Sequence, residues 1–131
     1  GDYLALRNYQ WHEWTDLSKV GVTATYTVDD PKTVNGLDLT YYVNSSCFES
    51  ENMTIDISII DVNGANHKID SFVIKKGVTA FDVDIPYHKD FGSNISVSKF
   101  VISAKAAMPV GFSGSSCVFV KDIVATFGLT Q

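Results

Sequence analysis

Cysteine is scarce in this chain, which has 131 residues and two cysteines, Cys47 and Cys117. Two cysteines exclude a four-cysteine zinc site and a dense disulfide scaffold. Seventy residues separate the pair, and a bridge that closes so long a loop would stabilise the fold by about 4 kcal/mol in the chain-entropy model. The sequence is equally compatible with one long-range disulfide and with two buried free thiols.

Basic residues and long apolar runs are scarce as well. Ten Lys and Arg stand against fifteen Asp and Glu, which gives a formal net charge of −5 and a pI near 4.9. That charge has the wrong sign for binding a phosphate backbone, so we expect no nucleic-acid partner. No apolar run reaches the roughly 18 to 20 residues of a membrane helix, so we expect no membrane association. The first residues, GDYLALRN, lack the basic and apolar blocks of a signal peptide, so any export signal would already have been removed.

Catalytic motifs are missing too. The chain has no Gly-x-Ser-x-Gly elbow, no phosphate-binding glycine loop and no dinucleotide fingerprint. His12, His67 and His88 lie far apart in the sequence and form no metal-binding pair. Asp82 and Asp84 resemble the paired carboxylates of a glycosidase, but alternate acidic residues on one strand are more simply its solvated face. We therefore expect a protein that is not an enzyme.

Apolar residues are plentiful, at 45% of the chain, and they alternate with polar ones. Segments of period two are typical of half-buried strands, and turn residues such as Asn63-Gly64 separate them. The expected strands are residues 20–28, 37–43, 53–59, 67–74, 78–85, 95–106 and 117–127. Strands at this spacing, with one polar face each, predict an all-β fold, an antiparallel two-sheet β-sandwich of the jelly-roll type. The length suits a single domain over residues 1–131.

Three details of this pattern make sharper predictions. Asp29-Asp30-Pro31 and Asn35-Gly36 carry turn chemistry, so the first two strands should be separate. Pro86 should end the strand before it. The apolar parity changes between Val97 and Phe100, as a β-bulge would produce, and a short helix is the competing interpretation.

The unusual segment runs from residue 9 to residue 14. It holds both tryptophans of the chain and a tyrosine, interleaved with hydrogen-bonding residues: Tyr9, Gln10, Trp11, His12, Glu13 and Trp14. A sugar ring stacks its C–H face on an aromatic plane and needs hydrogen-bonding partners for its hydroxyls. The segment is therefore a candidate carbohydrate-binding site. In the competing interpretation, Trp11 and Trp14 are core anchors at one end of the sandwich.

Tyr42 is a second candidate for sugar binding. It lies on the polar parity of its strand, out of phase with Leu39 and Tyr41, so it should project away from the interior. An outward tyrosine on a sheet offers a stacking surface. Together with residues 9–14, Tyr42 favours carbohydrate binding.

Three stretches resemble strands of the β-jelly-roll carbohydrate-binding modules attached to plant-cell-wall-degrading enzymes. They are Leu37-Asp38-Leu39-Thr40-Tyr41-Tyr42-Val43, Gly77-Val78-Thr79-Ala80-Phe81-Asp82-Val83-Asp84-Ile85-Pro86 and Phe119-Val120-Lys121-Asp122-Ile123. The resemblance covers most of the chain in pattern. It implies a noncatalytic module that binds a β-linked plant cell-wall polysaccharide, of β-glucan, xyloglucan or mannan type, and targets an attached glycoside hydrolase. It also implies a secreted, extracellular protein that is part of a larger multimodular enzyme.

The resemblance further implies one structural calcium ion. Many of these modules hold calcium between the N-terminal strand and an acidic residue of the closing strand. Asp122 matches the acidic position, and Asp2 is the nearby N-terminal carboxylate. Calcium takes six to eight oxygen ligands, so carbonyls and water would complete the site. No other cofactor is expected.

Two other functions remain open on the residues. A structural or adhesion-type β-sandwich would mediate protein–protein interaction, and it predicts buried tryptophans and no glycan partner. A small lyase or hydrolase on a jelly roll would release reducing ends from a polysaccharide. Among glycans, the acidic net charge suits neutral polysaccharides and disfavours polygalacturonate, whose own negative charge would be repelled.

Overall fold

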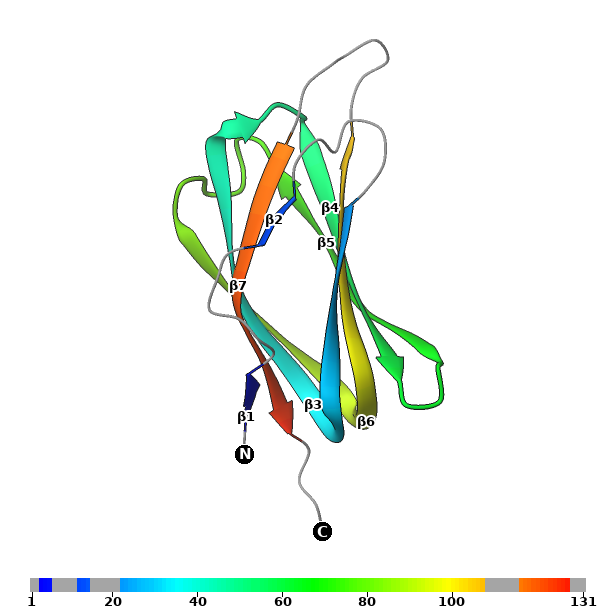
Figure 1. The fold of residues 1–131 in the computed structure, drawn as a ribbon. Coiled ribbons are helices and arrows are strands. Elements are labelled where there is room, and N and C mark those ends of the chain that lie inside the picture. Colours follow the sequence, from blue (N-terminus) through cyan, green and yellow to red (C-terminus); the bar gives the residue numbers. More distant parts are fainter. Residues whose placement is uncertain (1–2, 6–11, 15–21, 108–115, 128–131) are drawn as a thin grey trace.

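The computed structural model describes residues 3–5, 12–14, 22–107 and 116–127, and all the elements in these ranges are β-strands. They are β1 (Tyr3–Ala5), β2 (His12–Trp14), β3 (Val22–Phe48), β4 (Asn52–Asp61), β5 (Asn66–Lys75), β6 (Asp84–Ala107) and β7 (Ser116–Phe127). The strands pair antiparallel throughout. The predicted all-β antiparallel sandwich is confirmed (Figure 1). No helix within the described ranges is long and apolar enough to span a membrane.

Two long strands, β3 and β6, connect the two layers of the sandwich. Both bend at the lower end of Figure 1, so their halves lie in opposite layers. The first layer contains β4 and β5 with the first half of β3 and the second half of β6. The second layer contains β1, β2 and β7 with the second half of β3 and the first half of β6. Pairing therefore follows the order β1-β7-β3-β6-β4-β5, with β2 also on β7.

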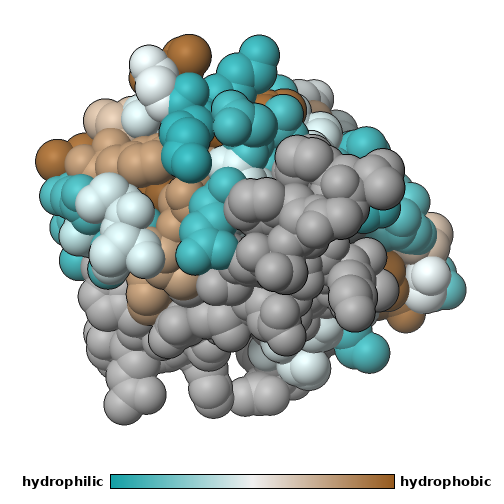
Figure 2. All heavy atoms as spheres, turned by 90° about the horizontal axis from the view of Figure 1, so that it is seen from above, coloured by the Kyte–Doolittle hydropathy of each residue, from teal (hydrophilic) through white to brown (hydrophobic). Residues whose placement is uncertain are grey.

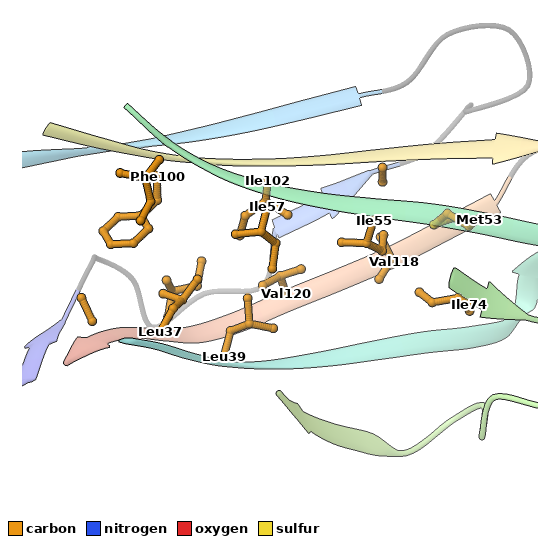
Figure 3. Packing of buried hydrophobic residues seen from close by; sticks show 14 of the residues in the cluster. Leu37, Leu39, Met53, Ile55, Ile57, Ile74, Phe100, Ile102, Val118 and Val120 are labelled. Atoms are coloured by element: carbon orange, nitrogen blue, oxygen red, sulfur yellow. The ribbon is translucent and has the colours of Figure 1, made fainter. Parts of the chain in front are cut away.

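The hydrophobic core fills the space between the layers. In β4 buried residues alternate with half-exposed ones, and the buried members are Met53, Ile55, Ile57 and Ile59. Figure 3 shows Ile57 and Ile102 of the first layer pointing toward Leu39 and Val120 of the second. Full burial of one such side chain contributes about 1.5–3 kcal/mol, so these alternating positions are the main source of stability.

The parity change near residue 98 is a β-bulge, as one of the two interpretations predicted. The β4–β6 register shifts between Ile60 and Asp61. Ser98 occupies the bulge and donates its hydroxyl to the carbonyl oxygens of these two residues, at 3.0 and 3.1 Å. Val97 and Phe100 are consequently both buried, on either side of the bulge. The helix interpretation is wrong because strands on both sides of β6 satisfy its backbone.

The prediction of two separate strands within residues 20–43 is wrong. Residues Val22–Phe48 form the single strand β3. The turn segments instead produce register shifts against β6, one between Thr27 and Lys32 and one between Val34 and Gly36. Such irregularities bend a strand without ending its pairing, which is how β3 passes from one layer to the other.

The strand predicted over residues 78–85 is also wrong. This segment is a loop up to the start of β6, because Gly77 and Asp82 both take left-handed backbone angles, with φ of +81° and +62°. Pro86 does not end a strand but lies inside β6, where it pairs with Thr40. At this end β3 is the one neighbour of β6 among the described strands, so the missing N–H of the proline can face outward from an edge.

Three half-buried aromatic side chains contact one another between the two layers, along one side of the sandwich. The ring of Phe72 on β5 stacks on that of Tyr87 on β6, with centroids 5.3 Å apart, and lies 5.5 Å from that of Tyr41 on β3. The Tyr87 hydroxyl donates to Asp70 Oδ2 at 2.7 Å. Burial, and then this hydrogen bond, raise the pKa of Tyr87 well above its usual range.

The sequence left open whether the cysteines form a disulfide or are free thiols. In the structure Cys47 is disulfide-bonded. The chain has one other cysteine, Cys117, which belongs to β7. One residue before it, the buried hydroxyl of Ser116 bonds to that of Ser50 at 2.8 Å. Ser116 Oγ also accepts from the backbone N–H of Ser50 at 3.1 Å. These contacts hold the end of β3 against β7.

Candidate functional site

Two aromatic side chains contact each other on the outer surface of the second layer. Tyr42 on β3 pairs in register with Phe119 on β7, and the rings meet edge to face, with centroids 6.1 Å apart and planes at 68°. Their chain neighbours Val43 and Val118 are buried in the core. Alternation therefore turns Tyr42 and Phe119 to the opposite, outward face, as the parity of Tyr42 predicted.

These two rings line a surface pocket of about 320 Å³. The other lining residues in the described part of the chain are Asn44, two positions after Tyr42 on β3, and Asp84, the first residue of β6. Tyr42 pairs in register with Asp84 as well as with Phe119, because β3 lies between β6 and β7. Three adjacent strands thus build the pocket, and its floor is as rigid as the sheet.

The polar groups of the pocket are a carboxylate and an amide. Asp84 Oδ2 forms an ion pair with Lys121 Nζ at 3.1 Å, and its second oxygen has no partner in the described part of the chain. Asn44 Oδ1 accepts from the backbone N–H of Ser46 at 2.9 Å and from its hydroxyl at 2.7 Å. This leaves the amide nitrogen of Asn44 as a donor. The residues that line this mostly apolar pocket therefore include one with an acceptor and one with a donor, beside two rings.

Asp82 fastens the loop before β6 to the rim of the pocket. Its backbone N–H donates to the carbonyl of Val43 at 2.8 Å, and its Oδ1 accepts from the backbone N–H of Ser45 at 3.0 Å and the hydroxyl of Tyr42 at 3.3 Å. The bonds with Ser45 hold the pKa of Asp82 below its ordinary value. Burial, and then the Asp82 carboxylate, raise the pKa of Tyr42. Asp82 thus fixes the direction of the Tyr42 hydroxyl.

Further along the same outer face, His88 lies between two carboxylates. Its Nδ1 is 2.8 Å from Asp38 Oδ1 and its Nε2 is 3.0 Å from Asp90 Oδ1. Asp38 pairs with His88 in register across β3 and β6. The hydrogen bond with Asp38, and then that with Asp90, raise the pKa of His88 because they favour the protonated imidazole.

The sequence-predicted segment 9–14 is described in part. Tyr9, Gln10 and Trp11 lie outside the described residues. The remaining three, His12, Glu13 and Trp14, form β2 and pair with β7. In that register Glu13 is opposite Phe119 of the pocket, whereas Trp14 is opposite the buried Val118. The backbone of β2 therefore adjoins the pocket strand, and the binding role of the segment stays a prediction.

Of the two acidic residues predicted to bind calcium, one lies within the described residues. Asp122 is an exposed residue of β7 with a φ of +52°, and Asp2 lies outside the described residues. Within the described ranges no group of three or more His, Cys, Asp or Glu side chains could hold a metal ion. Calcium at Asp2 and Asp122 remains a prediction.

Asn44 and Phe119 were not predicted as site residues, and Asp84 was expected on a solvated strand face. Phe119 did carry a usable signal, because it alternates with Val118 and Val120 and so had to face outward if those two faced the core. Nothing in the sequence shows that β7 and β6 flank β3 beside Tyr42. That long-range pairing is what brings Asp84 and Phe119 to Tyr42.

No protein-family model and no curated protein matches this chain. Solved structures share its fold. A non-crystalline cellulose specific carbohydrate-binding module, CBM28, aligns at a TM-score of 0.55 and 12% identity, over 89% of this chain and 72% of its own. The Yersinia pseudotuberculosis-derived mitogen aligns at 0.51 and 13%, over 95% of this chain and 90% of its own.

A third similar structure comes from the Gt strain of infectious bursal disease virus. It aligns at a TM-score of 0.53 and 11% identity, over 95% of this chain but 32% of its own. Identities this low show a shared fold alone. The chain is therefore an antiparallel β-sandwich with the architecture found in carbohydrate-binding modules, in a mitogen and in a viral protein.

Proposed function

We propose that this chain is a noncatalytic module that binds a β-linked polysaccharide in the pocket formed by Tyr42, Asn44, Asp84 and Phe119. The observation that carries the proposal is the pairing of two outward aromatic rings with a carboxylate and an amide on three adjacent strands. The rings offer apolar surface for a sugar face, and the polar groups offer partners for its hydroxyls. The sandwich architecture shared with carbohydrate-binding modules supports the same proposal.

The finer parts of the proposal concern the glycan and its setting. We propose a neutral plant cell-wall glycan of β-glucan, xyloglucan or mannan type, bound outside the cell as part of a larger enzyme. An attached glycoside hydrolase would then work at a raised effective concentration of its substrate. The disulfide at Cys47 supports an oxidising compartment, since disulfides are rare in reducing ones.

Isothermal titration calorimetry with soluble β-glucan, xyloglucan, glucomannan and xylan tests the proposal. Tyr42→Ala and Phe119→Ala should each weaken binding by about tenfold or more, because each removes a stacking surface. Val73→Ala removes an exposed apolar side chain from the other layer and should change nothing. Full affinity in folded Tyr42→Ala and Phe119→Ala proteins would contradict the site, and release of reducing ends would contradict the noncatalytic role.

A protein-binding role is the second candidate, because the loop between β5 and β6 exposes apolar side chains. Val78 is 79% exposed and Val83 is 47% exposed. Seen from above, hydrophobic surface gathers on the left of the molecule, the side on which Figure 1 draws this loop (Figure 2). A protein-interaction domain should lose its partner on Val78→Ser and Val83→Ser and keep it on Tyr42→Ala, the reverse of the result expected for a glycan module.

Structural calcium, with Asp2 and Asp122 among its ligands, is also part of the proposal. A metal that binds the native state raises the unfolding temperature, so excess EDTA should lower it and added calcium should restore it. Asp122→Asn should abolish that calcium response. An unfolding temperature that ignores both reagents would contradict the site.

A further inference from the structure

Among the described residues, the outer face that carries the pocket has an excess of negative charge. Its described carboxylates belong to Asp38, Asp82, Asp84 and Asp90. Against them stand the ammonium of Lys121, paired with Asp84, and the imidazole of His88, held between two carboxylates. The field at the pocket therefore attracts cations and repels anions.

The aromatic rings add to this preference. The face of an aromatic ring carries partial negative charge and attracts ammonium groups, most strongly where a carboxylate stands nearby. The Tyr42 hydroxyl donates to the Asp82 carboxylate at 3.3 Å, and this bond directs additional electron density toward the ring. Phe119 meets Tyr42 edge to face. Two rings and the residue Asp84 thus line one mostly apolar pocket, and a ring face beside a carboxylate is the chemistry that binds an organic cation.

We propose that the pocket selects a glycan that carries protonated amino groups, such as a β-1,4-linked glucosamine chain, over its neutral counterpart. This inference rests on the proposed function, because it assigns the substrate class of the same site. The sugar ring stacks on Tyr42 or Phe119, and its ammonium group lies beside Asp84.

The ion pair with Lys121 leaves room for such a ligand. Lys121 Nζ occupies Oδ2 of Asp84 at 3.1 Å, while a carboxylate has two oxygens and about four acceptor positions. The Asp84 side chain is 54% exposed, so a ligand can reach the second oxygen from solvent. Since Asp82 adds a second negative charge at the rim, a ligand ammonium still meets a net negative environment.

Three β-1,4-linked hexamers that differ only at C2 provide the test: those of glucose, glucosamine and N-acetylglucosamine. At about pH 6, below the pKa of an ordinary amine, and at low salt, the glucosamine hexamer should bind about fivefold or more tightly than the other two. Asp84→Asn should bring the ratio of affinities close to one. Asp56→Asn is the matched control, since Asp56 also pairs with a lysine, Lys68 at 3.5 Å, but lies in the first layer. It should leave the ratio unchanged.

The outcomes separate this inference from the proposed function. Equal or weaker binding of the glucosamine hexamer, with the neutral hexamers bound, overturns the inference and leaves the glycan site standing. A preference that Asp56→Asn reduces as much as Asp84→Asn also overturns it, because the charge effect then belongs to the whole acidic protein. Failure of all three hexamers to bind the folded protein overturns the inference, and failure of the four polysaccharides named above to bind as well overturns the proposed function with it.

Discussion

The hydrogen bond from Tyr87 to Asp70 should contribute about 1 kcal/mol to the stability of the fold. Hydrogen bonds to charged groups are worth about 1.5–3 kcal/mol, and the partial exposure of this pair screens the interaction to about 1 kcal/mol. Tyr87→Phe removes the 2.7 Å bond but keeps the ring stacked on Phe72. We therefore expect a loss of about 1 kcal/mol, against about 3 kcal/mol for Tyr87→Ala, which also removes the packing.

Urea denaturation measures both variants, and pH gives an independent check. The folded-state pKa of Tyr87 lies above the unfolded-state value of 10.0, so its contribution is complete below pH 10 and is lost as the pH rises further. The advantage of the wild type over Tyr87→Phe should shrink there. In a double-mutant cycle, Asp70→Asn should cost less in the Tyr87→Phe background. Equal stability of wild type and Tyr87→Phe, or a stability difference that stays constant up to alkaline pH, would show that the hydrogen bond from Tyr87 to Asp70 does not stabilise the fold.

Three further predictions concern stability and protonation. Reduction of the Cys47 disulfide, which closes a loop of about seventy residues, should lower the unfolding free energy by about 4 kcal/mol, measured by urea denaturation with and without reductant. Ile57→Ala should cost about 2–5 kcal/mol in the same assay, whereas Thr54→Ala on the outer face of β4 should cost under about 1 kcal/mol. The pKa of His88 is raised, so the stability it gives is present below its unfolded pKa near 6.5 and is lost as the pH rises through the folded value. In an NMR titration, Asp38→Asn should lower this pKa, and an unchanged value would contradict the hydrogen bond.

The fold could be predicted from the sequence wherever a strand buries one face. Period two predicted a strand over residues 53–59 and identified its inward residues, because a half-buried strand must alternate, and this range lies within β4. The strand expected over residues 67–74 lies within β5. The bulge at Ser98 was visible for the same reason, since inserting one residue reverses the parity of everything after it. These features depend on local pattern alone.

The predictions from sequence were wrong where a local sequence pattern is compatible with more than one backbone structure. Asp29-Asp30-Pro31 suits a turn, but it also suits a strand that bends while paired, and only the partner strand β6 decides between them. Residues 78–85 alternate as a strand does, yet left-handed angles at Gly77 and Asp82 break the pairing. Pro86 is compatible with β6 because that segment lies at an edge, which no single-strand pattern shows.

Within the candidate site, the sequence predicted the outward orientation of Tyr42, because that orientation follows from the alternation of its own strand. Parity identified Tyr42 as outward, but Phe119 and Asp84 in the same pocket come from other strands. Phe119 reaches Tyr42 through the β3–β7 register, and Asp84 through the β3–β6 register. A site assembled by long-range pairing is invisible until those registers are known.

The most direct test of the central claim is an NMR titration of the ¹⁵N-labelled protein with a β-1,4-linked glucan hexamer. If the glucan binds at the pocket of Tyr42 and Phe119, the amide shift changes should cluster at residues 42–46, 82–84 and 119–121. The first layer, including β4 and β5, should stay unperturbed. Changes centred on β4 and β5, or none at saturating glucan, would contradict a glycan site on this face.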